Sequence, residues 1–76
     1  MRKSTNVKYV DRIQKEILKR LGSGRSVSLT MKSTGDDLII AKGSDGFTLY
    51  NGCDLIVGDT SIKVISMMIA DGDVRP

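Results

Sequence analysis

The sequence contains no histidine and no tryptophan, and only one cysteine, one proline and three aromatic residues among its 76 positions. Without histidine, the commonest general base is missing, and so are the Ser–His and Cys–His pairs of nucleophilic catalysis. Cys53 has no second thiol with which to form a disulfide, and a lone thiol is typical of proteins from a reducing compartment. We therefore predict a cytoplasmic protein in which Cys53 is a small structural residue.

Other chemical signatures are also missing. No apolar run has the length needed to cross a bilayer, and no signal-peptide run follows Met1. The seven acidic residues after residue 25 are all Asp and mostly lie at predicted turns, where carboxylates satisfy local backbone groups, and they do not form a calcium-loop pattern. We expect no enzyme activity, no cofactor, no metal ion and no membrane contact.

The chain length predicts one small domain spanning residues 1–76. A chain of this size buries only about 60–65% of the surface of its unfolded form, so its core is thin. Small domains without disulfides or metals often gain stability by oligomerising, and we therefore predict a homo-oligomer.

A long amphipathic helix is predicted over residues 6–21. Its apolar residues recur at spacings of three and four, which places them within an arc of about 120° on one face. These residues are Val7, Val10, Ile13, Ile17 and Leu21. Residues 4–6 offer side-chain oxygens for an N-cap, and Gly22 suits a left-handed C-terminal stop.

Positive charge is concentrated in the first third of the chain. Residues 1–25 carry eight basic and two acidic side chains, whereas residues 26–76 carry four basic and seven acidic ones. Four cations of the predicted helix fall within an arc of about 60° opposite the apolar face. They are Lys8, Arg12, Lys15 and Lys19. Such a stripe suits either a solvated outer face or contacts with a phosphate backbone, and the sequence leaves both interpretations open.

Five strands are predicted after the helix from alternating apolar residues and turn signals. They span residues 26–32, 38–42, 47–50, 53–57 and 60–70. Asn51–Gly52 is the strongest hairpin signal, and Gly58–Asp59 is a second candidate for a two-residue turn. Because strands joined by short turns are antiparallel neighbours, we predict an α+β fold in which the helix precedes a five-stranded meander, curled into a small bent sheet or barrel.

The last predicted strand changes its apolar parity along its length. Ile62 and Val64 alternate with polar residues, but Ile65 and the apolar residues after it occupy the opposite positions. Either a bulge resets the facing, or both faces of the strand are covered. A last strand that is apolar on both faces could pair edge to edge with another subunit. The candidate oligomer interface consists of Ile65, Met67, Met68 and Ile69.

Residues 27–50 carry a strand, a glycine turn and a second strand, followed by an acidic and a large apolar residue. The second half of this pattern is Leu38-Ile39-Ile40-Ala41-Lys42-Gly43 and then Asp45-Gly46-Phe47-Thr48-Leu49. It resembles the Sm and Hfq family of RNA-binding ring proteins. The resemblance implies a small SH3-like barrel and a ring joined through the fourth and fifth strands. Thr48 stands where the family has asparagine and residues 57–59 where it has a basic motif, so its RNA-contacting residues do not carry over.

Two functions fit these features. In the first, a small oligomeric module binds an anionic ligand, either nucleic acid (RNA or DNA) or a nucleotide. Its candidate binding residues are Arg2, Lys3, Lys8, Arg12, Lys15, Lys19 and Arg25. In the second, the module binds a protein through an apolar patch around residues 67–69, in the manner of small accessory or inhibitor proteins of phages and mobile elements. The charge layout favours the anionic ligand.

Overall fold

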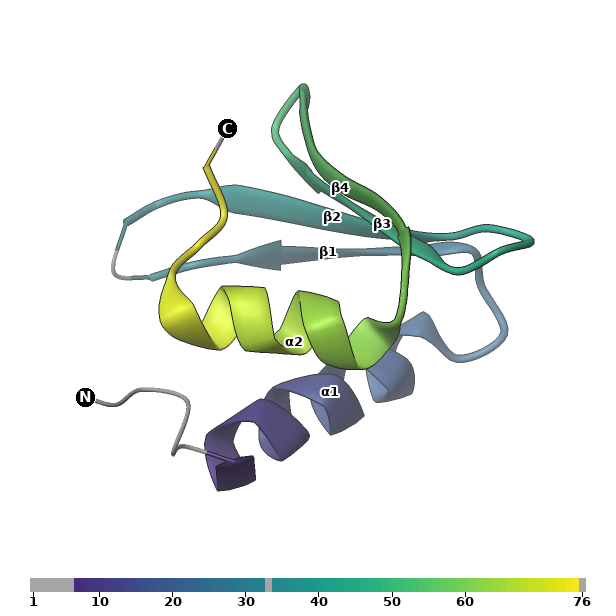
Figure 1. Cartoon of the computed structure of the whole chain (residues 1–76), viewed down its shortest axis with the longest axis horizontal. Coiled ribbons are helices and arrows are strands. Elements are labelled where there is room, and N and C mark those ends of the chain that lie inside the picture. Colours follow the sequence, from purple (N-terminus) through teal and green to yellow (C-terminus); the bar gives the residue numbers. More distant parts are fainter. Residues whose placement is uncertain (1–6, 33, 76) are drawn as a thin grey trace.

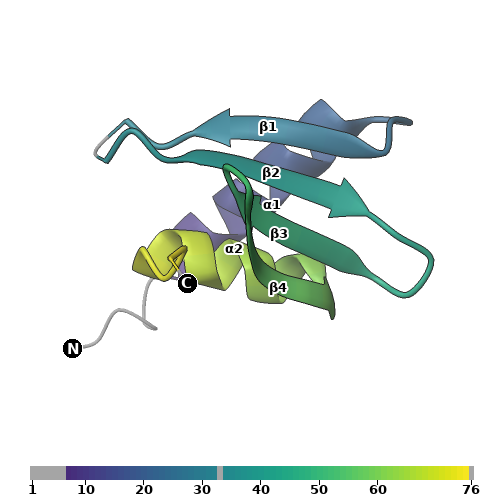
Figure 2. The ribbon, with the colours of Figure 1, turned by 90° about the horizontal axis from the view of Figure 1, so that it is seen from above.

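The computed structural model describes residues 7–32 and 34–75, which form two helices and four strands (Figure 1). The elements are α1 (Val7–Leu21), β1 (Ser26–Thr30), β2 (Asp37–Lys42), β3 (Phe47–Asn51), β4 (Asp54–Thr60) and α2 (Ile62–Asp71). The strands form one antiparallel sheet in the order β1–β2–β3–β4, and both helices lie on the same side of it (Figures 1 and 2). The predicted α+β class and the N-terminal helix are confirmed.

Helix α1 ends as its sequence predicts. Gly22 adopts a left-handed conformation with φ of 55°, and its N–H donates to the carbonyl oxygen of Leu18 at 3.0 Å. Ile17 and Leu21 of the predicted apolar face are buried, and Val10 and Ile13 are half-buried. The predicted N-cap at residues 4–6 lies outside the described residues.

The sheet presents alternate residues to the helices. In the register of the four strands, Val27 lies opposite Ile40, Ile40 opposite Leu49, and Leu49 opposite Val57. Ile40 and Leu49 are fully buried, because the helices cover this row, whereas Val27 and Val57 on the two outer strands are half-buried. The four predicted strands that exist differ from the observed ones by three residues or fewer at each end.

Both predicted two-residue turns need correction. Gly58–Asp59 is not a turn but lies within β4, where two residues oppose the single residue Thr48, and Asp59 takes a positive φ of 51°. A second extra residue, Ile56, interrupts the register between Val57 and Leu55, so β4 carries two bulges. The β3–β4 hairpin has Gly52 and Cys53 as its loop residues, because Asn51 pairs with Asp54.

The predicted fifth strand is wrong, because residues 62–71 form the helix α2. The side chain of Ser61 accepts the N–H of Val64 at 3.2 Å as an N-cap, and Gly72 ends the helix with a left-handed φ of 77°. The apolar residues change parity because their spacing here is that of a helix. Ile62 is half-buried, and Ile65 and Ile69, three and seven residues later, lie in the core. Helical spacing therefore explains the change of parity, in place of both alternatives, a bulge or a strand covered on both faces.

The sheet is open, and its closure into a barrel is not confirmed. Strands β1 and β4 are its two edges. Since the described residues after β4 form a helix, the fifth strand through which a ring of the Sm type would assemble does not exist here. The resemblance to that family therefore extends no further than the helix and the antiparallel strands.

The C-terminal residues pack against the core through Val74. The side chain of Val74 is 1% exposed, and its carbonyl oxygen accepts the Nδ2–H of Asn51 at 2.7 Å. Arg75 lies 3.5 Å from the carboxylate of Asp36. Asn51, predicted to form a turn, instead ties the tail to β3.

Replacing Gly46 by alanine is expected to lower the free energy of unfolding by about 3 kcal/mol, because the site is both strained and crowded. Its φ is +151°, and a Cβ there would lie 2.8 Å from the carbonyl oxygen of Thr60. Urea unfolding followed by circular dichroism measures the change. Gly58→Ala is the control, since its Cβ would meet nothing nearer than the Thr48 hydroxyl at 3.8 Å. Equal losses in both variants would contradict the close approach at Gly46.

Ser61→Ala is expected to cost about 1 kcal/mol through loss of the α2 N-cap, whereas Ser61→Asp retains the cap and most of the stability. The same urea titration, monitored at 222 nm, compares the two. A larger loss for aspartate than for alanine would argue against a helix start at this position.

Candidate functional site

The predicted basic stripe lies on the outward face of α1. Its four described cations, Lys8, Arg12, Lys15 and Lys19, are all exposed and project from the side of the helix opposite its buried residues. Arg25, also exposed, lies beyond the helix end and directly before β1. Arg2 and Lys3 lie outside the described residues.

Two ion pairs within α1 reduce the charge of this face only in part. Lys15 lies 3.3 Å from Asp11, and the Nε–H of Arg20 donates to Glu16 at 2.7 Å. That hydrogen bond and the charge of Arg20 hold the pKa of Glu16 below its ordinary value. The helix carries five basic and two acidic side chains, so its surface stays positive.

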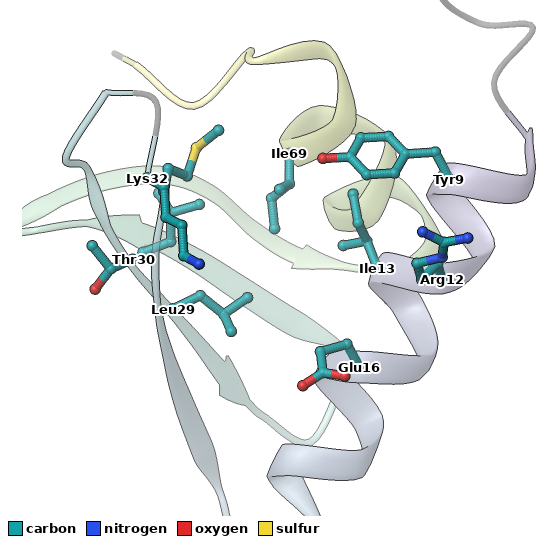
Figure 3. A pocket seen from close by; sticks show the side chains of 10 residues that line it. Tyr9, Arg12, Ile13, Glu16, Leu29, Thr30, Lys32 and Ile69 are labelled. Carbon is teal, nitrogen blue, oxygen red and sulfur yellow. The ribbon is translucent and has the colours of Figure 1, made fainter.

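A groove of about 530 Å³ runs between the N-terminal part of α1 and strand β1 (Figure 3). The floor of the groove is apolar, and both helices and the sheet contribute to it. Ile13 belongs to α1 and Ile69 to α2, while Leu29 lies on β1, Met31 directly after β1, and Leu38 on β2. Its rim is polar and consists of Tyr9, Arg12, Glu16, Thr30 and Lys32. The tyrosine, 44% exposed, reaches across one end of the groove from α1 (Figure 3).

The sequence offered only indirect signals for this groove. Leu29 and Met31 lie on the apolar side of the alternating pattern over residues 26–32, and Tyr9 lies off the centre of the apolar face of the predicted helix. Leu29 and Met31 are half-buried and Tyr9 is exposed, since α1 packs against α2 as well as β1 and does not close over the strand. The angle between helix and strand is a tertiary feature that periodicity does not report.

The predicted interface residues on α2 do not form one surface. Ile65 and Ile69 belong to the buried core of the chain itself, and Met68 is half-buried. Only Met67, 41% exposed, and its neighbour Val64 present apolar surface on this helix.

A separate apolar row lies on the side of the sheet that bears no helix. Ile39, Tyr50 and Leu55 are paired in register across β2, β3 and β4. Ile39 and Tyr50 are half-buried, while Leu55 is 61% exposed. This row is short and shallow compared with the groove.

The acidic residues do not gather into a metal site. Within residues 7–32 and 34–75, no three His, Cys, Asp or Glu side chains lie together in a way that could hold a metal ion. Cys53 is exposed at the β3–β4 turn. None of the described helices combines the length and apolarity needed to cross a bilayer.

Comparisons with protein-family models, with curated proteins and with solved structures found no match. Two surfaces of the chain itself therefore point to its function: the basic face of α1, and the groove beside β1.

The carboxylate of Asp36, which lies beside Arg75 of the C-terminal residues, has a shifted pKa, so its contribution to stability depends on pH. A hydrogen bond from the Thr34 hydroxyl at 2.7 Å, together with Asn51 and Arg75, holds the pKa of the Asp36 carboxyl below its ordinary value of 3.8. A lowered pKa in the folded state means that ionised Asp36 stabilises the fold above the unfolded pKa, and that this contribution is lost as pH falls through the folded pKa.

Asp36→Asn is therefore expected to reduce stability at pH 6 and to flatten the loss of stability on acidification below about pH 4. Thermal unfolding between pH 2 and pH 6 measures both effects. Asp45→Asn, in the exposed β2–β3 turn, is the matched control, and an identical pH profile for the two variants would contradict the role of Asp36.

Proposed function

We propose that this protein is a small non-enzymatic binding module that takes an anionic ligand, nucleic acid or a nucleotide, on the outward face of α1. The observation that carries the proposal is the set of exposed cations on one helix face, away from the buried core. Because α1 buries its opposite face, these side chains are held in a row without any cost of burying charge.

The row has dimensions suited to a phosphate backbone. From Lys8 to Lys19 the helix rises by about 17 Å, which corresponds to about five nucleotides of one strand along a duplex axis. Contacts of this kind need only positive charge at regular spacing and carry no sequence preference. A homo-oligomer, which remains part of the proposal, would present several such rows to one ligand and raise the overall affinity.

A second candidate function, binding of a protein partner, is favoured by the groove between α1 and β1. It has an apolar floor and a charged rim, whereas the apolar surface of α2 at Val64 and Met67 lacks a comparable hollow. In both functions the protein acts in the cytoplasm and performs no chemistry.

Binding of a fluorescent 20-nucleotide single strand and of the matching duplex, titrated at salt concentrations between 50 and 200 mM, tests the first function. Affinity is expected to fall steeply with salt, and Lys19→Ala is expected to reduce the slope of log K against log salt by about 1. Lys42→Ala, an exposed cation at the end of β2, removes the same charge elsewhere and should leave the slope unchanged.

Equal effects of Lys19→Ala and Lys42→Ala would show that net charge, and not the face of α1, governs binding. No binding at 50 mM salt would overturn the proposal. Light scattering, read with the ratio of absorbance at 260 and 280 nm on protein purified without nuclease, reports the oligomeric state and any nucleic acid that co-purifies.

A further inference from the structure

Strand β1 has a free edge whose hydrogen-bonding groups can be assigned. The N–H of Met31 donates to Asp36 at 2.8 Å, and the N–H of Lys42 donates to Arg25 at 2.7 Å. Hydrogen-bonded and non-hydrogen-bonded positions alternate along an antiparallel pair, so the odd-numbered residues of β1 bond to β2. The N–H and C=O groups of Ser26, Ser28 and Thr30 therefore point outward along the edge, where no described strand pairs with them.

The opposite edge of the sheet does not offer an equal template. Strand β4 carries two bulges, and acidic residues stand at Asp54 and Asp59. Bulges and charges are the usual devices that prevent strand addition at an edge. Residues 26–30 of β1 contain no bulge, no proline and no charge, so β1 alone keeps a regular and open ladder.

The groove adjoins this edge. A strand added beside β1 would direct every second side chain to the helix side of the sheet, which is the side on which α1 and β1 enclose the groove (Figure 3). Leu29 of β1, Met31 directly after this strand, and Ile13 of α1 form apolar walls there and are only half-buried in the chain alone. An incoming apolar side chain would complete their burial.

The charges around the edge select the partner. Arg25 and Lys32 stand at the two ends of β1, and Arg12 lies on the rim of the groove. The carboxylate on that rim, Glu16, is already paired with Arg20. A second copy related by two-fold symmetry would bring the same cations to the interface, whereas an acidic segment would neutralise them.

We infer that the free edge of β1 and the adjoining groove bind an extended acidic segment of a partner protein, which adds to the sheet as its fifth strand. Backbone bonds to Ser26, Ser28 and Thr30 supply the affinity, and apolar side chains in the groove and carboxylates at Arg12 and Lys32 supply the selectivity. The inference goes beyond anion binding by the outward face of α1, because it depends on the backbone of β1.

The probe is a nine-residue synthetic peptide of alternating glutamate and valine, blocked at both ends, and titrated into the isotopically labelled protein. Binding is expected to slow hydrogen exchange at the amides of Ser26, Ser28 and Thr30 at least tenfold, and to leave Val27 and Leu29 unchanged. A lysine–valine peptide of the same length is expected to bind at least tenfold more weakly.

Ser28→Pro removes an outward N–H that the sheet of the chain itself does not use, and proline is tolerated in edge strands. It is expected to weaken peptide binding at least tenfold, while Ser28→Ala, which keeps the N–H, binds normally. If Ser28→Pro does not fold, the same peptide N-methylated at alternate residues removes the bonds from the partner's side, and unchanged affinity of that peptide would overturn the inference.

Lys32→Ala separates this site from the face of α1. It is expected to weaken binding of the acidic peptide threefold or more and to leave oligonucleotide binding unchanged, whereas Lys19→Ala should do the reverse. Peptide-induced changes confined to α1 would overturn the inference. A doubled mass in light scattering with outward amides protected in the absence of peptide would also overturn it, because a second copy would then occupy the edge.

Discussion

Seven aliphatic side chains from every layer of the fold meet in one buried cluster, and the arrangement of the helices follows from it. Ile17 comes from α1, Leu38 and Ile40 from β2, Leu49 from β3, Ile65 and Ile69 from α2, and Val74 from the C-terminal tail. Each such burial contributes about 1.5–3 kcal/mol. Because so few side chains form the core, both helices must lie on the same side of the sheet to complete it.

The functional surfaces are consequences of that one-sided packing. Helix α1 presents one face to the core, so its opposite face must meet solvent, and that is the face that carries the basic residues. Packing of α1 against α2 also leaves the helix short of closing over β1, which produces the groove. Since the helices cover a face of the sheet and not its edge, the outward backbone groups of β1 remain open to a partner.

The two proposed binding surfaces make different physical demands on their ligands. The face of α1 attracts a phosphate backbone through separated charges in high dielectric, so its affinity depends on salt. The β1 edge needs a ladder of hydrogen bonds and an apolar fit, which depend much less on salt. Arg12 stands between them, on the outward stripe and on the rim of the groove.

Helix α2 shows where local reasoning fails. Ser61 and Gly72, which cap it, are visible in the sequence, yet residues 61–64 alternate as a strand does, and isoleucine and valine favour strands. Burial decided the outcome, because a helix places Ile65 and Ile69 together on the sheet, whereas an extended segment would have exposed one face of a strongly apolar stretch. The two cap residues are the sequence signal from which helix α2 could have been predicted.

The sequence by itself determined the extent of α1, the four strands of the meander and the common face of the cations, since each depends on spacing between near neighbours along the chain. Only the tertiary structure decided the helical state of residues 62–71, the groove beside β1 and the edge that stays open. These depend on which side of the sheet is covered and at what angle, and such long-range packing is not encoded in the period of any single segment.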